Sequence, residues 1–575
     1  MYIEYSIISF ILVRCVNSGS LFTTIQYYLH YDIRSRSMWW FLALAGFLVP
    51  LFSVSAGNDN NPIVNTPLGR VRGFKMSSRG GREFQAFTAI PYAKPPVGML
   101  RFQPPKPVDP WKGLKDATGG VPYCLTMDTF SPEPKAIGVE DCLVVSVFTH
   151  NVSGRAPVIV HIHGGGFIVG NADVKPLYLM DEDLVIVDVN YRLGILGFLS
   201  FEDEEMPGNQ GLKDQSLALR WVQENIASFG GNPDCVTIAG ESAGGYSVYH
   251  HTVSPLSRGL FHRAIAESGT SYDIGSLMPP GYVRNNAMRL AKYMDCEGNT
   301  TQEIVTCLRN ADPKELASQL VKYRVWQVDP LSTFRPVLEP PGPGAFLTGK
   351  VSDWDHAPVP LLTGVTAAEG LLRALYFITM DMDFNWYNDH FNEVTPSTLG
   401  YLATSSEPDE VTKKVKEFYL PKNNISFIDW YKIVQMHSDA TFTVGAIMGA
   451  DNHKGKVYFY FFNYLGEYTL AGKHNRSVVV GAYHMDEMIY LWCLPPYDKL
   501  KGPDLKLSNN LVKMWSRFAA TGNPTLVNGD IIWDNWSVER HNYLHISDKG
   551  FTMEENFLQD RYNFWSTLNY RDKLM

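Results

Sequence analysis

Short apolar runs alternate with a helix-like stretch in the first half of the chain. Residues 158–162, 184–189 and 236–239 are rich in β-branched side chains, and each run ends in a loop. Residues 208–229 follow the second run and have the length and mixed polarity of a helix. Strands that alternate with helices predict a parallel sheet that carries helices on both faces.

Three other segments have a pattern of their own. Residues 61–73 alternate around turn residues, which predicts an early hairpin. Residues 90–111 are rich in proline, which excludes regular helix and central strand and predicts an ordered surface loop. The run Pro340–Gly344 predicts a surface turn. No internal repeat or low-complexity segment is present.

The N-terminal region contains an apolar run at 39–54, preceded by Arg34 and Arg36 and followed by the small-residue pattern at 54–56. This arrangement is typical of a secretory signal peptide. The alternative is an uncleaved membrane anchor, but the run is shorter than the roughly 20 residues that span a bilayer. We therefore expect a secreted, extracellular protein whose mature chain does not insert stably into a membrane.

These features suggest a division of the chain. Met38 is the expected natural start, so residues 1–37 are interpreted as an upstream extension without an assigned role. Residues 38–56 form the predicted signal peptide, and residues 57–575 are expected to form one α/β domain.

Composition supports an extracellular globular protein. Apolar residues make up 45% of the chain and charged residues 19%, which is ordinary for a soluble domain. The net charge of −9 and the lack of a long basic run make nucleic acid an unexpected partner. Seven cysteines are too few for a disulfide scaffold. Five N-x-S/T sequons favour a secreted glycoprotein, with candidate sites at Asn151, Asn299, Asn424, Asn475 and Asn535.

The strongest chemical signal is Gly240-Glu241-Ser242-Ala243-Gly244, a G-x-S-x-G motif. It follows an apolar run and precedes a stretch that can continue as helix, which is the strand–turn–helix context of a nucleophile elbow. Glycine is expected at Gly240 and Gly244 because a Cβ atom would clash in so tight a turn. The alternative is a chance match in a glycine-rich loop. The context favours Ser242 as a nucleophile.

A second glycine-rich motif follows the run at 158–162. His163-Gly164-Gly165-Gly166 can direct bare backbone N–H groups at one oxygen atom. Together with the N–H of Ala243, those of Gly165 and Gly166 would stabilise a tetrahedral oxyanion. The alternatives are a flexible loop or a phosphate cradle, and a cradle would require a lysine or a helix directly after the glycines.

A serine nucleophile needs a general base and an acid that orients it. The order Ser–acid–His of nucleophile-elbow folds excludes upstream histidines and draws attention to His484, in a glycine-led loop. Glu369 follows a predicted short strand at 360–365 and is the preferred acid. From the residues alone, other histidines stay open, as do three alternative acids: Asp353, Asp355 and Asp439.

These motifs resemble those of the type-B carboxylesterase and cholinesterase family over about residues 60–570, and secreted insect esterases most of all. The segment Phe229-Gly230-Gly231, then Val236 and the G-x-S-x-G motif, follows that family's active-site signature. Glu140–Leu143 opens its second signature, where Val144 and His150 depart from the usual residues. Further matches lie at 90–93, 100–102, 190–192, 211–215 and 518–524.

The resemblance implies an α/β-hydrolase fold, with a large, mostly parallel sheet between helices. It implies a triad of Ser242, Glu369 and His484, and oxyanion donors at Gly165, Gly166 and Ala243. It further implies that Ser268 steadies the acid and that Glu241 supports the site from beside the nucleophile. The implied disulfides are Cys124–Cys142 and Cys296–Cys307, which leaves Cys15, Cys235 and Cys493 unassigned.

The implied activity is hydrolysis of a small-molecule carboxyl ester through an acyl-enzyme, with no metal and no cofactor. The first disulfide loop lacks the tryptophan with which cholinesterases bind quaternary ammonium, so choline esters are not expected. Juvenile hormone esterases usually carry Gln where this chain has Glu241. A hormone- or odorant-specific esterase stays open, as does a non-catalytic adhesion protein of the same fold. The natural ester and the oligomeric state do not follow from the sequence.

Overall fold

The computed structural model describes residues 61–129, 131, 133–325, 329–379, 383–421, 425–472, 478–527, 529 and 532–574. The predicted upstream extension and signal peptide lie outside these residues, as do Cys15, Asn424 and Asn475. The other three candidate sequon asparagines, Asn151, Asn299 and Asn535, are exposed. No helix in the described part of the chain is long and apolar enough to span a bilayer.

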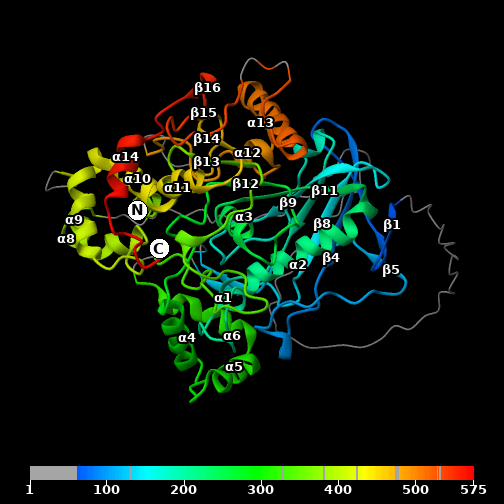
Figure 1. Cartoon of the computed structure of the whole chain (residues 1–575), viewed down its shortest axis with the longest axis horizontal. Coiled ribbons are helices and arrows are strands. Elements are labelled where there is room, and N and C mark those ends of the chain that lie inside the picture. The colour runs from blue at the N-terminus through cyan, green and yellow to red at the C-terminus, as the bar shows by residue number, and fades with distance from the viewer. Residues whose placement is uncertain are drawn as a thin grey trace, which may run out of the picture. The chain divides into compact units, whose positions relative to one another are not determined.

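The described chain is organised around an eleven-stranded mixed sheet with the order β16-β15-β14-β13-β12-β11-β9-β10-β8-β4-β3. Neighbouring strands are parallel from β10 to β15, and the strands at both ends pair antiparallel. In Figure 1 the last strands of the chain lie at one end of the sheet and the first at the other. The strands are β3 (Phe74–Ser77), β4 (Glu83–Pro91), β8 (Val144–Thr149), β9 (Ala156–Ile162), β10 (Val185–Val189), β11 (Gly231–Glu241), β12 (Arg263–Glu267), β13 (Leu361–Thr366), β14 (Val457–Asn463), β15 (Tyr543–Ser547) and β16 (Gly550–Glu554).

Two small sheets and a set of helices complete the fold. The small sheets contain β1 (Ile63–Thr66), β2 (Gly69–Arg72) and β5 (Leu114–Asp116), and β6 (Thr126–Asp128) with β7 (Lys135–Ile137). The α-helices are α1 (Gly194–Phe198), α2 (Gln210–Asn225), α3 (Ala243–Val253), α4 (Tyr282–Tyr293), α5 (Thr301–Asn310), α6 (Pro313–Ser318), α7 (Leu371–Thr379), α8 (Phe384–Thr398), α9 (Pro408–Tyr419), α10 (Trp430–Ser438), α11 (Val444–Asn452), α12 (Met488–Leu491), α13 (Gly502–Thr521) and α14 (Gln559–Ser566).

The apolar runs read from the sequence form the centre of the sheet. The runs at 158–162, 184–189 and 236–239 fall on β9, β10 and β11, and the run at 360–365 falls on β13. All five residues of β10 are buried, as expected for a strand covered on both faces. The predicted hairpin is the antiparallel pair β1–β2, and the predicted helix at 208–229 is α2 followed by a short 3-10 turn.

The proline-rich segment at 90–111 differs from the predicted surface loop. Its first two residues belong to β4, which pairs with β8 and β3 inside the sheet. Tyr92 and Phe102 are almost fully buried, and the Tyr92 hydroxyl donates to the carbonyl of Asn190. Pro91 can end a sheet strand because the chain leaves the ladder there, so proline content alone gave the wrong boundary.

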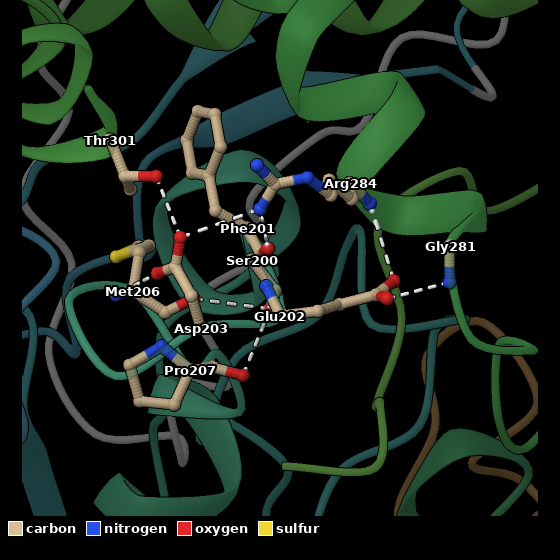
Figure 2. Close-up of polar contacts among 9 residues, drawn as sticks. All are labelled: Ser200, Phe201, Glu202, Asp203, Met206, Pro207, Gly281, Arg284 and Thr301. Atoms are coloured by element: carbon tan, nitrogen blue, oxygen red, sulfur yellow. Dashed lines mark hydrogen bonds and ion pairs between the residues drawn. The ribbon is translucent and has the colours of Figure 1, made fainter. Parts of the chain in front are cut away.

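A short loop after α1 fastens the N-terminal end of α4, as Figure 2 shows. The Glu202 carboxylate accepts hydrogen bonds from the backbone N–H groups of Gly281 (2.6 Å) and Arg284 (3.3 Å). Asp203 accepts a bond of 2.6 Å from the Thr301 hydroxyl at the start of α5. Carboxylates are well placed at these ends because the first N–H groups of a helix lack partners within the helix.

The structure contains both disulfides that the resemblance implied. Cys124 is joined to Cys142, and Cys296 to Cys307. Cys235 is not disulfide-bonded. The first bridge closes the loop that precedes β8, and the second joins the end of α4 to α5. Both therefore tie connecting segments to the body of the fold.

Candidate active site

Ser242 occupies the sharp turn between β11 and α3. Its backbone has φ 57° and ψ −121°, a conformation that a residue with a side chain rarely adopts. A Cβ atom at Gly244 would lie 2.0 Å from the carbonyl oxygen of Ile162, and one at Gly240 would lie 2.6 Å from the backbone of Gly244. The glycines of the G-x-S-x-G motif are therefore required by close packing, and the turn is a nucleophile elbow in geometry.

The turn exposes Ser242 to a pocket. The serine is 9% exposed, and it lines a cavity of about 110 Å³ together with Gly166, Glu369 and Phe442. Its hydroxyl forms no hydrogen bond with any residue in the described ranges. The side chain is thus accessible to a small molecule that enters the pocket.

Glu369 and His484 meet beside this turn although 115 positions separate them in the chain. The Nδ1 atom of His484 lies 2.5 Å from Oε2 of Glu369. The other oxygen of Glu369 accepts hydrogen bonds from the Ser268 hydroxyl (2.6 Å) and the backbone N–H of Thr366 (2.7 Å). Glu369, the expected acid, therefore contacts His484, and Ser268, which was expected to steady the acid, contacts Glu369.

The second nitrogen of His484 faces Glu241. The distance from Nε2 to Oε1 of Glu241 is 2.9 Å, and no hydrogen bond joins His484 to the Ser242 hydroxyl in the described structure. Glu241 directly precedes Ser242, so the imidazole lies at the elbow. Phe442, which lines the pocket, stacks on the imidazole with ring centroids 4.5 Å apart.

Burial and charge act in opposite directions on these groups. Burial lowers the pKa of His484, but the charges of Glu241 and Glu369 outweigh it and raise that pKa well above its ordinary value. Burial raises the pKa of Glu241, and the nearby imidazole partly opposes that rise. The imidazole between two carboxylates is therefore stabilised in its protonated form, which is the form a general base reaches during catalysis.

The glycine loop after β9 is shaped by contacts with the elbow. Gly165 and Gly166 have φ values of 99° and 63°, in the left-handed region that favours glycine. At Gly164 a Cβ atom would lie 2.6 Å from both the carbonyl and carboxylate oxygens of Glu241. Within the described chain, the N–H groups of Gly165, Gly166 and Ala243 have no hydrogen-bond partner. These three donors are free to bind an oxygen atom.

The alternative acids lie elsewhere. Asp353 and Asp355 are exposed, and Asp355 pairs with Lys454. Asp439 is buried but is bound by the Arg561 guanidinium and the Tyr419 hydroxyl. None of these three carboxylates contacts His484. Their positions along the chain did not distinguish them from Glu369 as the acid, whereas their positions in the fold do.

Sequence reasoning missed further ionisable groups near the site. Glu267 and Glu487 are buried, and they accept hydrogen bonds from the Trp515 indole (2.8 Å) and the Tyr460 hydroxyl (2.9 Å). Burial raises the pKa of Glu267 to about 8. Glu267 is next to Ser268 in the sequence and Glu487 is close to His484, which could have drawn attention to both. Nothing in the sequence shows that they are buried.

Comparison with known proteins agrees with this geometry. A sequence model of the carboxylesterase family matches residues 60–565. The chain belongs to the carboxylesterase family. The fold resembles the crystal structure of juvenile hormone esterase from Manduca sexta, with a TM-score of 0.77 and 27% identity over 88% of this chain and 99% of that one. The predicted α/β-hydrolase fold is therefore confirmed.

Relatives in this family carry the names of ester hydrolases. Juvenile hormone esterase of Tribolium castaneum is 32% identical, with 89% of this chain and 95% of the relative covered. Esterase E4 of Myzus persicae is 36% identical, with 84% and 92% covered. Pyrethroid hydrolase Ces2a of Mus musculus is 34% identical, with 84% and 88% covered. The chain is a carboxylesterase, and the adhesion alternative is not favoured.

Proposed function

We propose that this carboxylesterase works through a Ser242–His484–Glu369 triad and a covalent acyl-enzyme. The observation that carries the proposal is the Glu369–His484 contact beside a serine held in an elbow and open to a pocket. Glu369 fixes the imidazole with its proton on Nδ1, so Nε2 is the basic nitrogen.

In the first half of the reaction, Nε2 of His484 takes the proton of the Ser242 hydroxyl while the serine oxygen attacks the ester carbonyl. The carbonyl oxygen becomes an oxyanion, which the N–H groups of Gly165, Gly166 and Ala243 stabilise. The imidazolium then gives its proton to the departing alcohol oxygen as the carbon–oxygen bond breaks.

In the second half, His484 deprotonates a water molecule that attacks the acyl carbonyl. The acid leaves as the imidazolium returns the proton to Ser242. The first step requires Nε2 to turn from Glu241 towards the serine. Catalytic hydrogen bonds that are long in a free enzyme commonly form only once substrate is bound.

The test is Ser242→Ala, assayed with p-nitrophenyl acetate. We expect kcat/KM to fall by about 10⁴-fold or more, because the covalent path is lost while the oxyanion donors remain. Ser247→Ala is a matched control, since Ser247 lies in α3, the helix that begins directly after Ser242. Among the described residues its hydroxyl accepts from the Gln215 amide and donates to the carbonyl of Ala243. Wild-type turnover in Ser242→Ala would contradict the mechanism.

The proposal includes export from the cell. The signal-peptide pattern at 38–56, the two disulfides and the three exposed sequons support a secreted glycoprotein with one domain over 57–575. Expression from Met38 in insect cells tests it. We expect enzyme in the medium that begins near Gly57 and loses mass with an N-glycosidase; enzyme retained in the cells would contradict export.

A further inference from the structure

The pocket that contains Ser242 also contains two arginines, Arg335 and Arg373. Glu369 is the carboxylate among the pocket-lining residues. Its oxygens are occupied by His484, Ser268 and the N–H of Thr366. In the described structure, this carboxylate is therefore engaged by other donors and forms no ion pair with either arginine.

The two arginines differ in how they are compensated. Arg373 lies 2.7 Å from Asp329, and both side chains are largely buried. Arg335 has no carboxylate within ion-pair distance in the described part of the chain. Its Nη1 reaches the carbonyl of Ile274 at 3.4 Å and its Nη2 the sulfur of Met278 at 3.1 Å, while its Nε has no partner among the described residues.

Arg335 nevertheless stays charged. Burial lowers its pKa to about 10, which is far above neutral pH. The nearby hydroxyls of Tyr282 and Tyr246 favour the charge and Arg373 opposes it. A carbonyl at 3.4 Å and a thioether are weak acceptors, so this partly buried guanidinium makes few of its possible hydrogen bonds to the described part of the protein.

Arg335 is partly buried, with its Nε shielded from solvent. A cation that is partly removed from water without a counter-ion loses solvation, and a bound anion compensates for part of that loss. The guanidinium suits a carboxylate in particular, because its planar fork can donate two parallel hydrogen bonds. A neutral alkyl chain cannot accept hydrogen bonds from this guanidinium, so it does not replace the hydrogen bonds of the water that it displaces.

We propose that Arg335 determines specificity, and that the pocket prefers esters that carry a carboxylate away from the scissile bond. This inference rests on the proposed function, since it assigns a substrate class to the Ser242 pocket. The carboxylate can belong to the acyl part or to the alcohol part of the ester, and the test includes both.

Two matched substrate pairs separate these cases. Methyl pentanoate and monomethyl glutarate differ by a carboxylate on the acyl chain. The second pair, 4-methylphenyl acetate and 4-acetoxybenzoate, differs by a carboxylate on the alcohol. Acid release is followed in a pH-stat at pH 8, with the uncatalysed rate subtracted. For wild-type enzyme we expect kcat/KM to be at least about 10-fold higher for the anionic member of one pair.

Arg335→Met removes the charge at similar length, and we expect it to lower kcat/KM for the preferred anionic ester by about 10- to 100-fold. Its effect on the neutral partner should stay below about 3-fold. Arg335→Lys should keep part of the preference, because it keeps the charge without the fork. The control is Asp329→Asn with Arg373→Met, which removes the compensated pair and should leave the preference in place.

The outcomes distinguish the two proposals. If wild-type enzyme favours the neutral ester in both pairs, or if Arg335→Met leaves both ratios unchanged, the specificity role is wrong. That result leaves the proposed function standing as long as Ser242→Ala is inactive on the neutral esters. If Ser242→Ala hydrolyses the neutral esters normally, the proposed function itself fails. The comparison of anionic and neutral esters on wild-type enzyme needs no variant, so it tests the substrate preference even if Arg335→Met does not fold.

Discussion

The two sides of the His484 imidazole are built differently. On the Nδ1 side, Glu369 is bound by three donors from His484, Ser268 and Thr366. On the Nε2 side, Glu241 lies 2.9 Å away and accepts no hydrogen bond from other described residues. Both carboxylates are buried. The number of donors therefore distinguishes a carboxylate with both oxygens hydrogen-bonded from one that contacts a single neighbour.

The contrast gives the two carboxylates different tasks. A carboxylate held in place by three donors can orient the imidazole through the whole reaction. Burial raises the pKa of Glu241, and the main opposing influence on that pKa is the charge of the His484 imidazole. Glu369 should then matter for the rate at every pH, and Glu241 mainly for the pH at which the enzyme becomes active.

The largest effect is expected from Glu369→Gln. The amide keeps the size but cannot accept from Nδ1 and from both other donors as an anion does. We expect kcat/KM to fall by about 10⁴-fold, as when a triad acid is replaced by its amide. Steady-state kinetics on p-nitrophenyl acetate measure it. A loss below about 10-fold would show that Glu369 does not orient the base.

A smaller effect is expected from Ser268→Ala, which removes one of the three donors. A lost hydrogen bond to a charged group costs about 1.5–3 kcal/mol, so we expect kcat to fall by about 10- to 100-fold with little change in KM. Ser271→Ala is the control, because Ser271 is buried nearby and bonds to His250 instead. Equal losses in the two variants would point to general destabilisation.

The smallest effect on the maximal rate is expected from Glu241→Gln. His484 must be neutral to act as a base, and Glu241 is one of the two charges that raise its pKa. Removing that charge lowers the pKa, so the acid limb of the kcat/KM profile should move to lower pH. On the plateau above the acid limb of both profiles we expect a change below about 3-fold. An acid limb that stays in place would show that Glu241 carries no charge in the working range.

The elbow could be predicted from sequence because its requirements are local. Gly240 and Gly244 are fixed by contacts within the turn and with the neighbouring strand β9. The central strands were equally readable, since a strand covered on both faces is a continuous apolar run. The choice of Glu369 rested on its position after β13, and the fold brings that residue to His484.

Other features depend on contacts between distant segments and left no local signal. The position of Nε2 beside Glu241 and the stacking of Phe442 on the same imidazole both bring together residues that are far apart in the chain. That no described carboxylate pairs with Arg335 depends on how its segment packs against Ile274 and Met278. The burial of Tyr92 and Phe102 in a proline-rich segment is of the same kind.

The central claim is that Ser242 is the one residue that becomes acylated. The most direct measurement treats the wild-type enzyme with a fluorophosphonate and locates the adduct by peptide mass mapping. We expect complete inactivation with one adduct per chain, on Ser242, and no adduct after His484→Ala under the same conditions. Inactivation with the adduct on another residue, or full activity with Ser242 modified, would contradict the account.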